Sequence, residues 1–398
     1  MKKSLLYLSA FLCAATASHA GVKVGVALDT TGPIASFMPP IEKAANLVLK
    51  QVNEQGGFFA SGEKLEYIKG DSACDPVAAV DVAKKMVDVN QVVAVFGPGC
   101  SGAAIAQAQS VTIPAGVVSI SFSATSPMMT SMEKGTDLVF RTVASDAYQG
   151  QVIADLAIKN GVKEIAVMYS NDDYNTGISQ VFVKSFKEKG GKVTAVQAFD
   201  PGKQTYRSEV TTLAKDTKNM ALFAYPGNGG IVILRNALET KAFNAFYAGD
   251  AMRSDDLAKQ LGADALTGLS VVSGTSDKDS EAYVKWLAAA KDVQLSSGEN
   301  FVANAYDAMF VLALAIEKAG STDRKKISEA LRSIANAPGE LIYPGEFKKA
   351  KEILAKGGDI QYVGASGAVD FDENGDVKTL YAINTVGKDG QWKMETLK

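Results

Sequence analysis

The feature that most constrains the fold of this 398-residue chain is a regular alternation of short apolar runs with amphipathic helical stretches. Strands that alternate with helices in this way are typical of βαβ units and of a parallel sheet. The first run of the pattern begins at Gly21. It predicts strands at 22–28, 65–69, 92–96 and 117–122, and helices at 41–53, 75–90 and 101–111.

The pattern then restarts, which predicts a second unit of the same kind. Its expected helices are 149–160, 176–189 and 204–215, and its expected strands are 165–169, 193–199, 220–225, 245–248 and 269–272. Two runs of about 125 residues each predict two α/β lobes, which agrees with the usual size of a domain. Further helices are expected at 280–290 and 301–319.

The first twenty residues have the features of a secretory signal peptide. Two lysines precede a mostly apolar run at 5–17, which is too short to span a bilayer. Ser18-His19-Ala20 fits the small-x-small cleavage pattern. We therefore expect cleavage after Ala20 and a mature protein in the periplasm.

Composition excludes several functions. The chain has 41 basic and 44 acidic residues, so it lacks the basic surplus of a nucleic-acid-binding protein. Its single histidine, His19, would leave with the signal peptide. A mature chain without histidine has no histidine base, no Ser-His-Asp triad and no His-rich metal site. We predict a binding protein rather than an enzyme; a hydrolase that pairs serine with lysine or aspartate is the enzyme alternative left open.

Two cysteines, Cys74 and Cys100, remain after cleavage. In an oxidising compartment such a pair is most simply one disulfide, and the alternative is two buried free thiols. A bridge closing about 26 residues would contribute about 3–4 kcal/mol to stability in the chain-entropy model.

Two motifs partly match known ligand-binding motifs, one for calcium and one for phosphate. Residues 370–375 begin like a calcium-binding loop, but Tyr381 stands where that loop needs a bidentate glutamate, and Asn374-Gly375 is typical of a hairpin turn. We therefore expect a hairpin there and no metal. Residues 97–102 follow a strand and open a helix, which makes an anion site suited to a carboxylate, although the P-loop ending is missing.

Taken in order, a set of short motifs resembles the leucine/isoleucine/valine-binding protein family. Each motif is weak alone, but together they span the whole mature chain. The matching segments are Val22–Val26 with Thr31–Pro33, Asn53–Gly57, Asp71–Pro76, Gly97–Ser101, Ser123–Pro127, Arg141–Thr142, Asp146 with Gln149–Gly150, Tyr174 with Gly177, and Val369–Asp376.

The resemblance implies an α/β type I periplasmic binding protein fold, with two Rossmann-like lobes whose parallel sheets are joined by three crossovers. Lobe one would comprise 21–145 and 274–381, and lobe two 146–273 and 382–398. The lobes of such a protein close on a ligand held in the cleft between them. Cys74 and Cys100 fall where the family has a disulfide within lobe one.

The family binds a free amino acid by its zwitterion, and its site residues transfer position by position. Ser101 and Thr125 would hold the α-carboxylate, and the carbonyl of Ser123, next to Ala124, would accept from the ammonium. Tyr174 would close from lobe two, and Asp250 takes the place of an ammonium-binding glutamate. The residues Ser101, Ser123, Thr125 and Asp250 also follow predicted strand ends, where open α/β sheets bind ligands.

Other positions are expected to have secondary roles or depart from the family. Asp146, at a crossover, is expected to orient the hinge or support the site from behind. Asn228 stands where the family has a tyrosine, and Phe37 where an aromatic ring touches the ligand side chain. Asp250 is one methylene shorter than glutamate, so the ammonium would sit deeper or contact it through water.

The resemblance implies a monomeric substrate-binding protein of an ABC importer, without a cofactor. It would deliver an apolar, branched-chain amino acid to a permease in the inner membrane. Two alternatives stay open: a ligand-sensing subunit of a receptor, or a binding protein for an amide, urea or an aromatic carboxylate.

Overall fold

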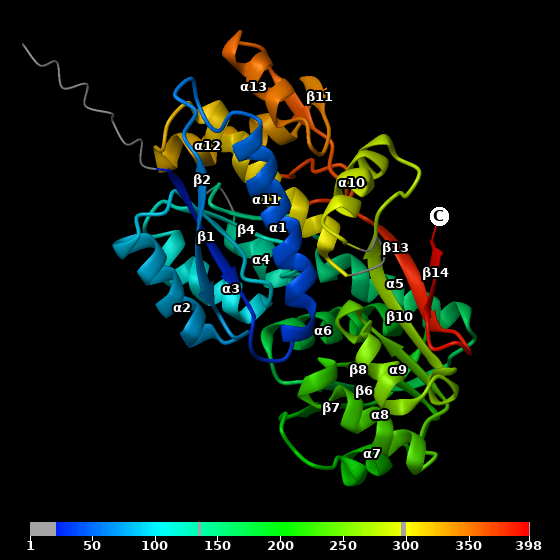
Figure 1. Cartoon of the computed structure of the whole chain (residues 1–398). Helices are drawn as coiled ribbons and strands as arrows, with labels where there is room; N and C mark the ends of the chain where they lie inside the picture. Colours follow the sequence, from blue (N-terminus) through cyan, green and yellow to red (C-terminus); the bar gives the residue numbers. More distant parts are fainter. Residues whose placement is uncertain (1–20, 134–136, 296–299, 398) are drawn as a thin grey trace, which may run out of the picture.

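The computed structural model describes residues 21–133, 137–295 and 300–397, and it shows two α/β lobes side by side (Figure 1). The expected signal peptide lies outside the described residues. Within the described part of the chain, no helix combines the length and the apolar character needed to cross a membrane.

The sheet of the first lobe is parallel throughout and has the strand order β2-β1-β3-β4-β5. These strands are β2 (Leu65–Asp71), β1 (Val22–Leu28), β3 (Ala94–Phe96), β4 (Val118–Ser121) and β5 (Val139–Arg141). Buried side chains of β1 and β3 enter separate apolar clusters on the two faces of the sheet. Burial on both faces explains why these strands are continuous apolar runs in the sequence.

Helices cover both faces of this sheet. On one face α1 (Met38–Glu54) packs along α11 (Val302–Ala319), and on the other α2 (Pro76–Lys84) packs against α3 (Ser101–Gln107) (Figure 1). Asp75 caps the start of α2, because its carboxylate accepts the N–H groups of Val77 and Ala78 at 2.9 and 2.8 Å.

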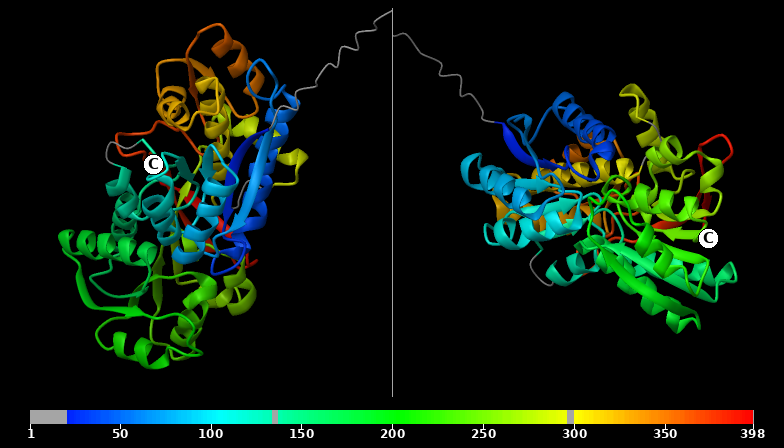
Figure 2. Two further views of the ribbon diagram at one scale, coloured as in Figure 1. Left: turned by 90° about the vertical axis from the view of Figure 1, so that its left-hand side faces the viewer. Right: turned by 90° about the horizontal axis from the view of Figure 1, so that it is seen from below.

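The sheet of the second lobe repeats the order in β7-β6-β8-β9-β10 and then adds two antiparallel strands. The parallel strands are β7 (Lys192–Phe199), β6 (Glu164–Ser170), β8 (Asn219–Phe223), β9 (Ala245–Ala248) and β10 (Leu269–Thr275). The strands β13 (Leu380–Val386) and β14 (Trp392–Thr396) bring the end of the chain back beside β10 (Figures 1 and 2). The antiparallel pair is the one addition to the predicted parallel sheet.

The second sheet is also covered by helices. They are α5 (Asp146–Lys159), α6 (Asp173–Glu188), α7 (Arg207–Leu213), α8 (Gly230–Glu239) and α9 (Asp255–Leu261).

After β10 the chain returns to the first lobe. This part contains α10 (Glu281–Asp292), α11, α12 (Arg324–Ala335), α13 (Phe347–Ala355) and the short parallel pair β11 (Glu340–Ile342) and β12 (Ile360–Tyr362). Beside α3 lies the short helix α4 (Pro127–Glu133). The first sheet therefore draws its strands from 22–141, and the second from 164–275 and 380–396. The lobe limits expected from the sequence stay a prediction.

The predicted disulfide between Cys74 and Cys100 is confirmed. It joins the segments that follow β2 and β3, with a Cα–Cα distance of 5.2 Å. Asp29, directly after β1, lies between them: its carboxylate accepts the N–H groups of Cys74 at 2.9 Å and Gly99 at 2.8 Å. The carboxyl ends of three neighbouring strands are therefore tied together.

The hairpin predicted around Asn374-Gly375 is wrong. A turn does form, because the Asp372 carboxylate accepts the N–H groups of Asn374 at 2.8 Å and Asp376 at 3.1 Å. The chain on either side does not pair as strands; the strand that follows, β13, pairs with β10 and β14 instead. The hairpin lies later, between β13 and β14, where a turn at 387–390 contains Asp389-Gly390.

Candidate ligand-binding cleft

A cavity between the lobes lies at the carboxyl ends of strands from both sheets. In each sheet the strand order reverses beside the first strand, at β1/β3 and at β6/β8, which is where ligands of open α/β sheets bind. The space among the lining residues, including its open mouth, is about 360 Å³. The lining residues are Ile34, Phe37, Met38, Ile41, Gly99, Cys100, Ser101, Ser123, Tyr174, Tyr225, Asp250, Ala251 and Phe301.

The first lobe contributes hydroxyl groups that are already hydrogen-bonded within that lobe. Ser101, the first residue of α3, accepts the N–H of Ser126 at 3.2 Å through its hydroxyl oxygen. Ser123 donates its hydroxyl to the carbonyl of Gly99 at 3.0 Å. The hydroxyl hydrogen of Ser101 finds no acceptor in the described parts of the chain, so it is available to a ligand oxygen.

Thr125 and Asp146 lie buried behind this wall, and neither lines the cavity itself. The N–H of Asp146 donates to the carbonyl of Thr125 at 2.8 Å. The Thr125 hydroxyl oxygen and both Asp146 carboxylate oxygens have no hydrogen-bond partner within the described residues. Burial, together with the charge of Asp250, raises the pKa of Asp146 well above its usual range. Sequence reasoning gave Asp146 a supporting role, and its unpartnered oxygens beside Asp250 give it acceptor capacity as well.

The second lobe contributes a carboxylate and two aromatic rings. Asp250 follows β9 in a short 3₁₀ turn, and the Tyr174 hydroxyl donates to its carboxylate at 2.9 Å. Tyr225 follows β8, and its ring centroid lies 5.5 Å from that of Tyr174. Burial raises the pKa of Asp250 above its usual value, and burial with the nearby Asp250 charge raises the pKa of Tyr174.

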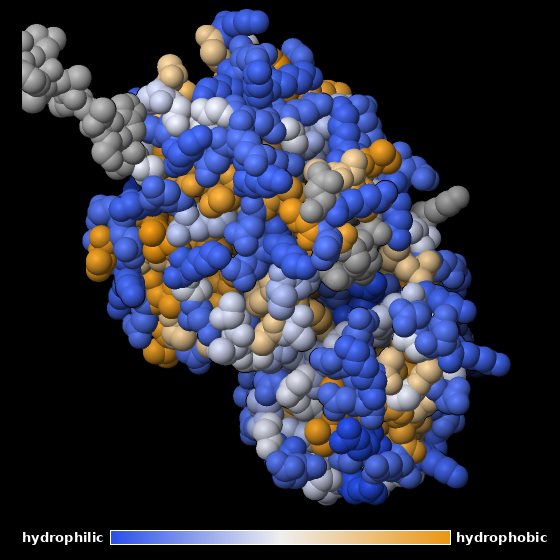
Figure 3. Space-filling view, viewed as in Figure 1, coloured by the Kyte–Doolittle hydropathy of each residue, from blue (hydrophilic) through white to orange (hydrophobic). Residues whose placement is uncertain are grey.

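An apolar wall completes the cavity. Ile34, Phe37, Met38 and Ile41 come from the start of α1 and the residues before it, and Phe301 comes from the residue before α11. Outside the cleft, hydrophilic side chains cover most of the face seen in Figure 3, with apolar residues in separate groups. The cleft therefore pairs a mostly apolar wall with one acidic group.

The structure brings Ser101, Ser123, Tyr174, Asp250 and Phe37 to one cavity; their roles in ligand binding stay a prediction. Three other predicted ligand-binding residues do not line this cavity. Thr125 is buried behind the wall. Ala124 is buried beneath the cavity, with its carbonyl turned to Arg141. Asn228 lies in a different groove, which it shares with Asn171, Asp172 and Pro33.

Sequence reasoning missed two lining aromatics, Tyr225 and Phe301. Tyr225 stands two residues past β8, so the rule for strand ends would have found it. No local signal marks Phe301, because it reaches the cavity only through the return of the chain to the first lobe.

A larger, more polar cavity of about 700 Å³ meets the cleft at Asp250 and Phe301. It lies between the end of β10, the start of α11 and β14. The lining residues include Arg253, Ser273, Thr275, Ser276, Trp286, Asn300, Asn304 and Met394.

Comparison with known proteins gives one family. Residues 40–389 match the family model described as the receptor family ligand binding region. A leucine-, isoleucine-, valine-, threonine- and alanine-binding protein of Pseudomonas aeruginosa is 30% identical over 315 residues, which cover 78% of this chain and 82% of the relative. A Leu/Ile/Val-binding protein of Rhizobium johnstonii is 30% identical over 345 residues, which cover 84% of this chain and 91% of the relative.

A solved leucine-binding protein of Thermotoga maritima has the same fold. It superposes with a TM-score of 0.78 at 26% identity and covers 94% of this chain and 97% of its own. The shared fold, the matching family model and the relatives that align over most of the chain agree with the resemblance found in the sequence. The chain therefore belongs to the leucine/isoleucine/valine-binding protein family, within the receptor family ligand binding region.

Proposed function

We propose that this protein captures an apolar α-amino acid as its zwitterion in the interlobe cavity. The observation that carries the proposal is the buried carboxylate of Asp250, which opens onto an otherwise mostly apolar cavity built from both lobes. A carboxylate placed in such a cavity favours a ligand that carries one cationic group and an apolar remainder.

The ammonium group would meet two acceptors at the cavity, with a second carboxylate behind them. Asp250 supplies the charge at the cavity. Asp146 lies behind the wall, close enough to Asp250 that the Asp250 charge raises the pKa of Asp146, and its carboxylate oxygens have no hydrogen-bond partner within the described residues. The carbonyl of Ser123 accepts no hydrogen bond within the described part of the chain. An ammonium that loses its water needs these contacts, because an unpaired buried charge costs several kcal/mol.

The α-carboxylate would lie at the start of α3. The hydroxyl of Ser101 has a hydrogen to donate, and the first N–H groups of a helix favour a negative charge. Thr125, with its unpartnered hydroxyl oxygen, would complete this side once the ligand is bound. The two charged groups of one amino acid would then meet opposite lobes.

The ligand side chain would pack on Ile34, Phe37, Met38, Ile41 and Phe301. Burying an aliphatic side chain of leucine size stabilises a complex by roughly 1.5–3 kcal/mol. No polar side chain other than Ser101, Ser123, Tyr174, Tyr225 and Asp250 lines this cavity in the described residues. This wall therefore favours leucine, isoleucine or valine over polar amino acids.

In its physiological role the protein would be a monomeric periplasmic component of an ABC importer that delivers the amino acid to a membrane permease. The names of its relatives support the amino-acid ligand; the importer and the permease are what the family resemblance implies. It would do no chemistry and need no cofactor. The described residues contain no histidine, and the Ser101 hydroxyl accepts from a backbone N–H rather than from a catalytic base.

The test is a thermal-shift screen of the mature protein with the twenty amino acids, followed by calorimetry. At a ligand concentration one thousand times the dissociation constant, binding should stabilise the protein by about 4 kcal/mol. We expect the largest shift from a branched-chain L-amino acid. If none of the twenty shifts the melting temperature while an amide, urea or benzoate does, the ligand lacks an ammonium and the proposal fails.

A further inference from the structure

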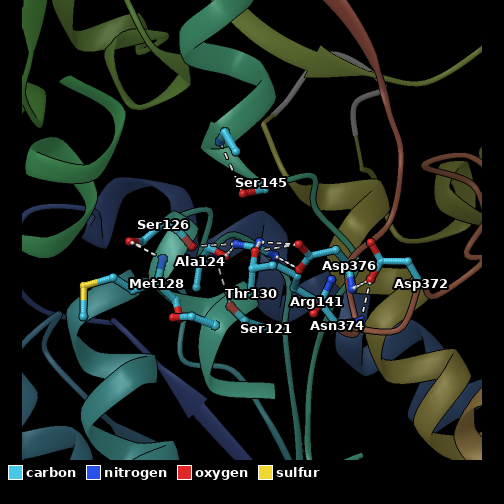
Figure 4. Close-up of polar contacts among 12 residues, drawn as sticks. Ser121, Ala124, Ser126, Met128, Thr130, Arg141, Ser145, Asp372, Asn374 and Asp376 are labelled. Atoms are coloured by element: carbon cyan, nitrogen blue, oxygen red, sulfur yellow. Dashed lines mark hydrogen bonds and ion pairs between the residues drawn. The ribbon is translucent and has the colours of Figure 1, made fainter. Parts of the chain in front are cut away.

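In the loop Ser123–Ser126, which we call the ligand loop, hydrogen bonds hold three of the four carbonyl groups, and one buried side chain makes two of these bonds. The Arg141 guanidinium donates to the carbonyls of Ala124 at 3.2 Å and Ser126 at 2.9 Å (Figure 4). The Ser126 carbonyl also accepts the N–H of Met129 at 3.1 Å. The Thr125 carbonyl accepts the N–H of Asp146. Of the four carbonyls, only that of Ser123 is left without a donor in the described residues, and Ser123 is the residue of this loop that lines the cavity.

Arg141 is itself fixed by a buried carboxylate from a distant part of the chain. Asp376, 235 residues later, accepts from Arg141 Nε at 2.6 Å and from Nη2 at 2.8 Å. The Thr130 hydroxyl bridges the pair, accepting from Nη2 and donating to Asp376, both at 2.7 Å. Arg141 is 1% exposed and Asp376 6%. The five donors of the guanidinium are all used, so its orientation is fully determined.

Asp376 belongs to the segment that leads into the second lobe. The turn at Asp372 holds its backbone, and the neighbouring Gly375 carbonyl accepts the N–H of Arg141 at 3.1 Å. Four residues after Asp376 the chain enters β13 of the second sheet. The turn that resembled a hairpin in the sequence therefore supplies two acceptors to Arg141, the Asp376 carboxylate and the Gly375 carbonyl. Both lie where the chain passes between the lobes.

We propose that Arg141 and Asp376 are positioning residues for ligand binding. The pair turns the Ala124 and Ser126 carbonyls away from the cleft, leaves the Ser123 carbonyl for the ligand, and ties the ligand loop to the segment that enters β13. This inference rests on the proposed function in that the ligand loop is taken to bind the ammonium; the contacts themselves do not depend on any ligand.

The matched control is Asp307, an equally buried carboxylate in the same lobe. It accepts hydrogen bonds from Tyr362, Ala365 and Ser366 and holds the turn after β12. Asp307→Asn removes a buried charge, as Asp376→Asn does, but it leaves the ligand loop alone. The two variants therefore separate loss of positioning from loss of stability.

Hydrogen exchange of the protein without ligand is the first test. We expect Asp376→Asn to speed exchange of the amides at 121–126 by about tenfold or more, with 362–366 unchanged, because exchange reports local opening. Asp307→Asn should give the opposite pattern. Thr130→Val removes only the bridging hydroxyl and should act in the same direction as Asp376→Asn, but more weakly. It also keeps the test decisive if Asp376→Asn does not fold.

Calorimetry with L-leucine as the probe is the second test. Asp376→Asn should weaken binding by about 10- to 100-fold, whereas Asp307→Asn, at a similar loss of melting temperature, should change it less than about twofold. If the folded position-376 or position-130 variants leave both the exchange at 121–126 and the affinity unchanged, the positioning role is refuted. If the unmodified protein binds neither L-leucine nor any other of the twenty amino acids, the proposed function is at fault and the exchange pattern still decides the positioning role.

Discussion

The two sides of the cleft are built differently. On the first lobe the polar groups are neutral and already hydrogen-bonded: Ser101 to Ser126, and Ser123 to Gly99. On the second lobe the group at the cavity is a carboxylate, Asp250, whose bond from Tyr174 stays within that lobe. One side is a rigid platform of hydroxyl and backbone groups, and the other carries the charge.

The difference indicates how binding energy is divided. A platform whose hydrogen bonds are already made loses little conformational freedom when a ligand arrives, so it supplies orientation at low cost. A buried carboxylate with a raised pKa is unfavourable until a cation reaches it, so it supplies the drive for the lobes to close. The first lobe would therefore set the orientation of the ligand, and the second lobe would supply most of the affinity.

The largest effect is expected at Asp250. Asp250→Asn keeps the size and the bond from Tyr174 but removes the charge, so it should weaken amino-acid binding by roughly 2–5 kcal/mol, or about 30-fold to several thousand-fold. Ser101→Ala, on the platform, removes one hydrogen bond to a charged group and should cost about 1.5–3 kcal/mol. Calorimetry on both variants measures the loss of affinity that each substitution causes. A change below about fivefold for Asp250→Asn would mean that the ligand presents no ammonium there.

The disulfide should matter for stability rather than for affinity. Replacing Cys74 and Cys100 by alanine frees a loop in the unfolded chain, and the free energy of unfolding should fall by about 3–4 kcal/mol. Urea unfolding measures this loss, and mass spectrometry of the unreduced exported protein checks the bond itself. Because the folded platform is kept, affinity should change less than about tenfold. A stability loss under 1 kcal/mol would show that Asp29 alone ties the strand ends together.

Closure should depend on a glycine of the second lobe that has little room for a side chain. A Cβ on Gly177 of α6 would lie 3.0 Å from Pro127 Cδ of the first lobe, whereas a Cβ on Gly227 would lie 3.8 Å from the Pro33 carbonyl oxygen. Gly177→Ala should weaken binding by about 1–3 kcal/mol through overpacking. The unliganded protein should melt no lower, because alanine favours the helix by about 1 kcal/mol. Equal affinities for Gly177→Ala and Gly227→Ala would contradict a tight contact between the lobes.

The smallest effect is a dependence of binding on pH. The pKa values of Asp146 and Asp250 are raised, so both carboxyls take up protons at a higher pH than usual. Affinity should therefore fall as the pH is lowered through these raised values, by at most about 1.4 kcal/mol per pH unit for one proton. The stability of the protein without ligand should change in the opposite direction. The stabilisation that Asp146 and Asp250 contribute is complete below the ordinary pKa of 3.8 and is lost as the pH rises through their raised pKa values.

Calorimetry from about pH 5 to 8, in buffers of different ionisation enthalpy, counts the protons released on binding. Asp250→Asn should flatten the profile, whereas Ser101→Ala should keep its slope. If the affinity of the unmodified protein does not change with pH, the charge of Asp250 does not contribute to binding.

Much of the fold was predictable because its signals are local. Apolar runs such as 22–28 and 245–248 gave the strands, and Asp75-Pro76 gave the start of α2. Strand ends then located Ser101, Ser123 and Asp250. The same local signals failed at Asn374-Gly375, where a turn typical of hairpins is followed by a strand that pairs with β10 and β14 instead.

The sequence by itself determined the alternation of strands and helices, the pairing of Cys74 with Cys100, and the family. Periodicity, turn residues and ordered motifs are properties of neighbouring residues, so the chain carries them before it folds. Only the tertiary structure decided that Tyr225 and Phe301 share a wall with Phe37, and that Asp376 fixes Arg141. These contacts join residues up to 264 positions apart (301 minus 37). Their formation depends on the order of the strands and on where the chain passes between the lobes, and no local pattern encodes either one.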